Sequence, residues 1–172
     1  LLQYVGSESK VSVPDSITVI AENAFQGNES LSELTLGENV TYINTRAFYG
    51  CEYLKKVTLN QYLESIGKSA FMDCSSLKSI AFPESLTSLD HYAFYNCSAL
   101  SDVQFSKTKI SYGIDTLVNT KWFDNFDGDC VITNDGTFLG YKGNDSELKL
   151  PDSINTLAPS SLEYTKLKKI TI

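Results

Sequence analysis

The chain has 172 residues, enough for one substantial core, and its 42% hydrophobic and 20% charged residues are ordinary for a folded globular protein. Its formal net charge of −7 argues against nucleic acid as a partner and against anionic membrane surfaces, because both need clustered basic side chains. No apolar run reaches membrane-spanning length and no signal peptide is visible, so we expect no direct insertion of this segment into a membrane.

A 23-residue repeat organises most of the chain. Three columns recur at this spacing: an Ala-Phe pair, a leucine six residues after the Phe, and a cysteine. The pairs are Ala24-Phe25, Ala47-Phe48, Ala70-Phe71 and Ala93-Phe94, the leucines are Leu31, Leu54, Leu77 and Leu100, and the cysteines are Cys51, Cys74 and Cys97. Each leucine opens an L-x-x-[LIV]-x-[LF] segment, whose alternating apolar residues predict a short strand. One such unit cannot bury its own apolar side, so stacked units must share a core that contains these columns.

The fold class that we expect is an α/β repeat solenoid. Its coils of about 23 residues would place short parallel strands on one face and short helical turns, which carry the Ala-Phe pairs, on the other. One β-hairpin would interrupt the stack. Residues 1–172 would then form a single solenoid that is a fragment of a longer array.

In chain order, residues 1–7 are expected to be the remnant of a hairpin, because residues 1–17 match residues 138–154 at an offset of 137. Residues 8–126 are the regular repeats. At their end, the helical spacing of Ile114, Leu117, Val118 and Trp122 predicts a longer helix, and Phe123-Asp-Asn-Phe126 occupies the place of the next L-x-x-L. Residues 127–144 predict the hairpin, since Asp135-Gly136 supplies the positive φ angles of a tight turn between Cys130–Thr133 and Thr137–Tyr141. Residues 145–172 resume the repeat.

The segment from Leu77 to Cys97, Leu-x-x-Ile-x-Phe-Pro-Glu-Ser-Leu-x-x-Leu-x-x-x-Ala-Phe-x-x-Cys, resembles the BspA-like (type 5) leucine-rich repeat family of bacterial cell-surface proteins. The resemblance covers about residues 8–122 and 145–172. It implies a leucine-rich-repeat fold, a cell-surface or secreted location and a role in adhesion to proteins or cells. The chain departs from the pattern at Ser106-Lys-Thr-Lys109 and at Ser161-Leu162, which flank the hairpin, so the resemblance does not define the curvature there.

Three groups of residues raise the question of chemistry, and for each of them a structural role is the main expectation. The cysteine column offers a metal site or disulfides between coils, or buried thiols; the absence of CxxC spacing and of histidine partners favours thiols. His91 is the only histidine and lies at a variable repeat position, which favours a surface residue over a catalytic one. An acidic cluster offers a calcium site, but it lacks EF-hand spacing, which favours a solvated loop. The cluster comprises Asp124, Asp127, Asp129 and Asp135. No cofactor, metal or catalytic residue is therefore expected.

The outward residues of the predicted strands form the candidate binding face, because solenoid curvature creates extended surfaces of this kind. The candidate ligand-binding residues are Glu33, Thr35, Lys56, Thr58, Ser79, Asp102 and Gln104. Tyrosines at variable positions either contact a partner or pack between coils. Two functions remain open: a non-catalytic recognition or adhesion module that binds protein or glycan through this face, and a structural spacer with no ligand of its own.

Overall fold

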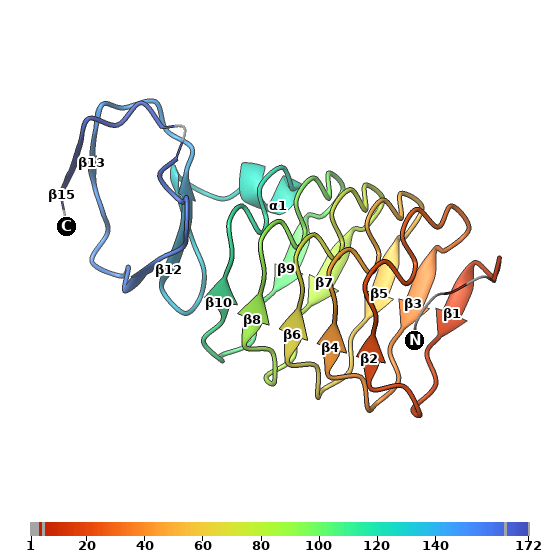
Figure 1. Cartoon of the computed structure of the whole chain (residues 1–172). Coiled ribbons are helices and arrows are strands. Elements are labelled where there is room, and N and C mark those ends of the chain that lie inside the picture. The colour runs from red at the N-terminus through yellow and green to blue at the C-terminus, as the bar shows by residue number, and fades with distance from the viewer. Residues whose placement is uncertain (1–3, 5, 164, 172) are drawn as a thin grey trace.

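The computed structural model describes residues 4, 6–163 and 165–171. These residues wind into a solenoid whose coils have three sides, two formed by strands and one by turns (Figure 1). The C-terminal segment, drawn in blue, continues the stack as a wider, less regular loop. The predicted repeat solenoid is confirmed, but the fold is a β-solenoid and not an α/β one.

The first side carries one three-residue strand per coil, and it lies behind the second side in Figure 1. Its strands are β1 (Lys10–Ser12), β3 (Glu33–Thr35), β5 (Lys56–Thr58), β7 (Ser79–Ala81) and β9 (Asp102–Gln104). Pairing is parallel and follows the repeat, since Lys10 lies opposite Glu33 and Glu33 opposite Lys56. The hydrogen-bonded strands form two groups, β1-β3-β5 and β7-β9, with an interruption between β5 and β7.

The second side is an uninterrupted parallel sheet of five two-residue strands. They are β2 (Val19–Ile20), β4 (Tyr42–Ile43), β6 (Ser65–Ile66), β8 (Ser88–Leu89) and β10 (Ser111–Tyr112). In each strand the second residue is buried and the first faces outward or is partly covered, as in Tyr42 and Ile43 of β4. This alternation places the apolar residue of every strand in the shared core.

The third side consists of turns, and here the predicted short helices are wrong. Two residues in each of five coils have positive φ, which stops a right-handed helix after one turn. One column is Asn23, Arg46, Ser69, Tyr92 and Asp115, and the other is Gly27, Gly50, Asp73, Asn96 and Asn119. Backbone hydrogen bonds still link successive coils, for example from Phe48 N to Ala70 O at 2.8 Å. The turn side is therefore a third ladder.

The core is a set of stacked columns. The rings of Tyr4, Phe25, Phe48, Phe71 and Phe94 stack face to face with centroids 4.8–5.1 Å apart. The four phenylalanines are at most 2% exposed, and the alanines that precede them are also buried. The column of Cys51, Cys74 and Cys97 is fully buried beside them. The identical side chains of successive coils thus fill one continuous interior.

The end of the regular stack differs from the predicted longer helix and extra L-x-x-L strand. The helix α1 (Lys121–Asp124) has four residues and begins at Thr120, whose hydroxyl accepts a hydrogen bond from Phe123 N at 3.1 Å. The rings of Trp122 and Phe105 lie 5.3 Å apart, so the helix covers the last coil where a strand was expected. No helix among the described residues is long and apolar enough to cross a membrane.

The predicted hairpin is present. Strands β11 (Cys130–Ile132) and β12 (Thr137–Tyr141) pair antiparallel, with an irregularity between Val131 and Ile132. Among the described residues of the turn, Gly136 has positive φ and Asp135 does not, which corrects the expected turn geometry. Strand β12 then pairs in parallel with β14 (Thr156–Leu157), and β13 (Glu147–Lys149) pairs in parallel with β15 (Lys169–Thr171).

The 137-residue offset is visible as repeated contacts. Val13 N donates to Thr35 O at 2.9 Å, and Leu150 N donates to Thr171 O at the same distance. The Tyr4 hydroxyl donates to Glu8, and the Tyr141 hydroxyl donates to Asp145 at 3.0 Å. An ion pair between Lys10 and Glu33 recurs with its charges exchanged between Glu147 and Lys169. The predicted hairpin remnant at residues 1–7 falls largely on residues 1–3 and 5, outside the described residues.

Candidate functional site

A groove on the first side of the solenoid is the candidate site. It has a volume of about 250 Å³ and extends over β5, β7 and β9, and it includes the place where β5 and β7 are neighbours but are not paired. Five of the seven predicted ligand-binding residues line it: Lys56, Thr58, Ser79, Asp102 and Gln104. The groove has four further lining residues that were not predicted as ligand-binding: Val57, Leu59, Ile80 and Ala81.

The hydrogen-bond ladder between β5 and β7, at the groove, is incomplete. The backbone hydrogen bond that precedes each pair of strands is short between other coils, for example 2.8 Å from Lys55 N to Ser32 O. The equivalent distance before β5 and β7, from Lys78 N to Lys55 O, is 3.5 Å. The hydrogen bond that follows β3 and β5 joins Leu36 N to Thr58 O at 3.0 Å. Among the described residues, the equivalent bond from Leu59 N to Ala81 O, after β5 and β7, is absent. The backbone hydrogen bonding of the first side is therefore weakest between β5 and β7.

Side chains on the inner and outer faces of the strands explain why the groove lies at β7. The core column of Leu36 and Leu59 changes at this point to Phe82, whose ring packs 5.6 Å from those of Phe94 and Phe105. We attribute the wider spacing to this larger ring beneath the sheet. On the solvent-facing surface, the outward residues of β7 are Ser79 and Ala81, which are smaller than the outward pair of any other strand on the first side. The combination produces a depression.

The groove combines an apolar floor with polar walls. Val57 and Ile80 are 8% and 2% exposed, and Lys56, Asp102 and Gln104 are exposed around them. Neither Lys56 nor Asp102 forms an ion pair within the described part of the chain, and Gln104 Nε2 lies 3.4 Å from Asp102 Oδ2. The groove thus presents a cationic group on β5 and an anionic and an amide group on β9, on opposite sides of β7. Such a set suits a polar partner group whose apolar part rests on the floor.

The two remaining predicted residues lie on β3, outside the groove. Glu33 pairs with Lys10 at 2.8 Å, and the hydrogen bond with Lys10 lowers the pKa of the Glu33 carboxyl. Thr35 is exposed on the same strand. Since Glu33 already has a partner on the neighbouring strand, the candidate site is narrower than the whole predicted face.

The cysteine column has no open chemistry in the structure. Cys51, Cys74, Cys97 and Cys130 are free thiols. The sulfurs of the first three lie 3.0–3.2 Å from the carbonyl oxygens of Phe25, Phe48 and Phe71, to which the thiols donate. Burial raises the pKa of Cys51 to about 11 and raises those of Cys74 and Cys97 as well. A raised pKa keeps the thiols neutral and therefore poor nucleophiles and metal ligands.

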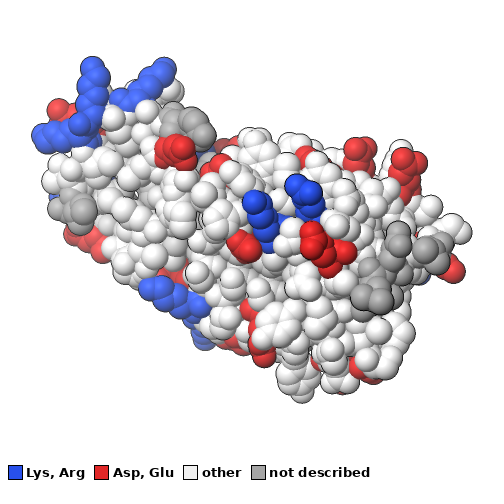
Figure 2. Space-filling view, in the orientation of Figure 1, with Lys and Arg blue, Asp and Glu red and all other residues white. Residues whose placement is uncertain are grey.

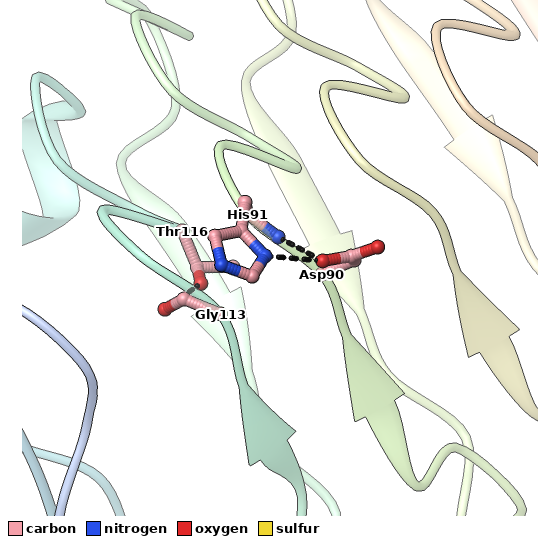
Figure 3. Close-up of polar contacts among 4 residues, drawn as sticks. All are labelled: Asp90, His91, Gly113 and Thr116. Carbon is pink, nitrogen blue, oxygen red and sulfur yellow. Dashed lines mark hydrogen bonds and ion pairs between the residues drawn. The ribbon is translucent and has the colours of Figure 1, made fainter.

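His91 pairs with its neighbour in sequence, and the geometry is not that of a nucleophilic site. Its Nδ1 lies 2.5 Å from Asp90 Oδ1 on the surface of the turn side, and both side chains are nearly half exposed. The nearby Thr116 hydroxyl donates to Gly113 O at 3.0 Å (Figure 3). Because this hydroxyl is bonded to a backbone carbonyl, His91 has no hydrogen-bonded nucleophile among the described residues.

The acidic cluster does not converge on a cation. No group of three or more potential metal ligands occurs among the described residues. Asp135 instead accepts hydrogen bonds from the Thr133 hydroxyl, from Thr137 N and from Ile110 N, the last at 3.2 Å. Burial acts to raise the pKa of Asp135, but these hydrogen bonds outweigh it and the pKa is lowered. The carboxylate therefore attaches the hairpin turn to the preceding coil.

Charged side chains are dispersed over the face in Figure 2. Lys and Arg side chains are densest around the C-terminal segment, at the upper left, and broad uncharged areas separate charges elsewhere. On this face the described residues form no continuous basic surface of the kind that follows a phosphate backbone.

Comparison with known proteins identifies the repeat. A family profile described as the BspA type leucine rich repeat region matches six copies over residues 3–122. Among curated proteins, none is significantly similar to the chain.

Solved structures with the same fold come from several bacteria. A leucine-rich repeat protein from Bacteroides capillosus is 28% identical, with a TM-score of 0.56, over 62% of this chain and 85% of its own. A leucine-rich repeat protein from Eubacterium ventriosum is 20% identical, with a TM-score of 0.61, over 99% of this chain and 52% of its own. The pneumococcal vaccine antigen PcpA is 18% identical, with a TM-score of 0.60, over 99% of this chain and 58% of its own. The chain thus spans little more than half of the last two proteins.

Proposed function

This chain belongs to the BspA-type leucine-rich repeat family, and we propose that it is a non-catalytic recognition module of a cell-surface or secreted protein, which binds a protein or glycan through the groove over β5, β7 and β9. The observation that carries the proposal is the groove itself, in which the small outward residues of β7 and its missing pairing with β5 coincide with a depression bordered by charged side chains of β5 and β9. The likeness to a protein named as a vaccine antigen is in keeping with a surface location.

The size and lining of the groove define what would fit. Its volume of about 250 Å³ lies below the roughly 300–1,000 Å³ of pockets that enclose a small molecule. It suits one protruding side chain of a protein, or one unit of a longer glycan, with the rest of the ligand lying along the strand face. Non-catalytic binding is supported by the neutral buried thiols and by the pairing of His91 with Asp90.

The test compares binding to a panel of immobilised extracellular-matrix proteins and to a glycan array by the chain and three variants. Lys56→Ala combined with Gln104→Ala removes two polar walls, and Ala81→Tyr fills the depression without removing a charge. Tyr42→Ala, which changes an exposed residue of β4 on the second side of the solenoid, is the control. We expect the first two variants to weaken binding about tenfold or more, which corresponds to about 1.4 kcal/mol, and the control to bind normally.

Binding that survives both groove variants would place the ligand elsewhere on the chain. Failure of the wild-type chain to bind any member of either panel would favour the alternative function, a structural spacer. The observation that favours a spacer is the continuity of the stack, since the five-stranded side and the stacked aromatic column run through the regular coils.

A further inference from the structure

A second, larger pocket lies where the turn side of the regular stack meets the hairpin. It has a volume of about 410 Å³, within the roughly 300–1,000 Å³ usual for small-molecule sites. One wall comes from the turns of the last regular coils, where Tyr95 and Val118 occupy the same position of successive repeats. The opposite wall comes from the end of β12 and from Ser160, Ser161, Glu163, Thr165 and Lys166. The pocket therefore exists only because the hairpin interrupts the repeat.

Aromatic rings line this pocket from three separate elements. Tyr95 projects from the turn side, Phe123 from α1 and Tyr141 from the end of β12. Glycine at position 140 makes room for one of them, because a Cβ there would lie 2.7 Å from Phe123 Cζ. Tyr141 is held by the hydrogen bond from its hydroxyl to Asp145 at 3.0 Å. The rings offer flat apolar surfaces in fixed places.

Polar groups of both signs surround the rings. Asp115 and Glu163 contribute carboxylates, and Lys142 and Lys166 contribute ammonium groups, so the lining is balanced in charge. Lys142 Nζ is occupied, since it donates to Phe126 O at 2.7 Å and to Asp124 O at 3.0 Å. Burial, and to a smaller extent the charge of Glu163, raises the pKa of Asp115. Neither carboxylate has an ion-pair partner within the described residues.

We propose that this junction pocket, lined by Tyr95, Phe123, Tyr141, Asp115 and Glu163, binds a neutral oligosaccharide. Sugar rings present apolar C–H faces that rest on aromatic rings, and pairs of hydroxyls that donate to carboxylates. A lining with balanced charge gives no advantage to a cationic or an anionic ligand, whereas hydroxyl groups use both carboxylate acceptors and ammonium donors. The site is separate from the strand groove, so either can exist without the other.

The experiment is an array of neutral, sialylated, sulfated and cationic oligosaccharides probed with the whole chain, followed by calorimetric titration with the strongest neutral binder. Tyr141→Ala and Tyr95→Ala should each weaken binding about tenfold or more, because each removes a stacking surface. Tyr141→Phe keeps the ring and should bind within about threefold of the wild type. Tyr53→Ala, which removes a 55% exposed tyrosine far from this pocket's lining, is the matched control and should bind normally.

Three results would overturn the proposal. The first is capture of charged oligosaccharides alone, or of none. The second is neutral-glycan binding that Tyr141→Ala leaves unchanged in protein whose circular dichroism matches the wild type. The third is loss of glycan binding in the Lys56/Gln104 double variant but not in the tyrosine variants, which would assign the glycan to the strand groove. Retention by Tyr141→Phe together with loss in Tyr141→Ala supports the proposal, because a folding defect alone would not follow the ring.

Discussion

Replacing Phe71 by alanine removes the central ring of the aromatic column. Phe71 is fully buried and lies between Phe48 at 4.9 Å and Phe94 at 5.1 Å, nearly parallel to both. Truncation of a buried phenylalanine costs about 3–5 kcal/mol of unfolding free energy. Each stacked pair contributes about 0.5–1.5 kcal/mol beyond its buried area, and two pairs are lost at once. We therefore expect the upper end of the range, about 5 kcal/mol.

The loss is measured by guanidinium unfolding followed with two signals. Circular dichroism reports the strands of the whole chain, and the fluorescence of Trp122, the only tryptophan, which lies in α1, reports the end of the regular stack. At about 2–4 °C per kcal/mol for a chain of this size, the thermal midpoint should fall by about 10–20 °C. Both signals should shift, because a cavity in a central coil weakens its interfaces with both neighbours.

The surface variant Tyr53→Ala is the control and should change stability by no more than about 0.5 kcal/mol. Phe71→Leu keeps most of the apolar volume and should cost less than Phe71→Ala. An unfolding free energy of Phe71→Ala within about 1 kcal/mol of the wild type would refute the reasoning, since it would mean that the column does not carry the stability of the stack.

Three further predictions concern the junction and the thiols. Gly140→Ala should destabilise the C-terminal segment by about 1–3 kcal/mol, because its Cβ would lie 2.7 Å from Phe123 Cζ; hydrogen exchange in residues 130–141 checks this, and unchanged protection would contradict it. The lowered pKa of Asp135 stabilises the fold above the carboxyl's unfolded pKa of about 4, and this stabilisation is lost as pH falls through the folded pKa. Asp135→Asn should therefore reduce the difference in thermal midpoint between pH 7 and pH 3, and an unaltered difference would count against the assignment. Cys130, which is partly exposed, should react with a thiol reagent before Cys51, Cys74 and Cys97, as peptide mapping after brief labelling would show; equal rates would mean that the column opens readily.

The sequence predicts whatever the repeat makes identical from coil to coil. Apolar positions spaced by 23 residues lie one above another, so the registers of Leu34 with Val57 and of Ile43 with Ile66 follow from counting. The hairpin was equally accessible, because an Asp-Gly pair between two apolar runs is a local signal. These features depend on nearest neighbours in the stack.

The turn conformation was not predicted, although part of its signal was present. The column of Gly27, Gly50, Asp73, Asn96 and Asn119 contains the residue types that tolerate positive φ, and it marks where each turn ends. The other positive-φ column includes Arg46, Ser69 and Tyr92, which have no such preference. At these positions the backbone hydrogen bonds between coils impose the positive φ on the residue, so the residue type carries little information about the turn.

Both candidate sites lie where the repeat changes, and there is a physical reason for this. In a regular solenoid each coil is covered by a neighbour of the same shape, so that adjacent coils pack closely. A mismatch between adjacent coils opens additional space. The substitution of Phe82 for a leucine supplies one mismatch, between β5 and β7, and the hairpin supplies the other, beside Tyr141. In arrays of this kind, ligand sites should therefore be sought where a coil departs from the repeat, because the repeated columns maintain the stack and a departure from them creates space for a ligand.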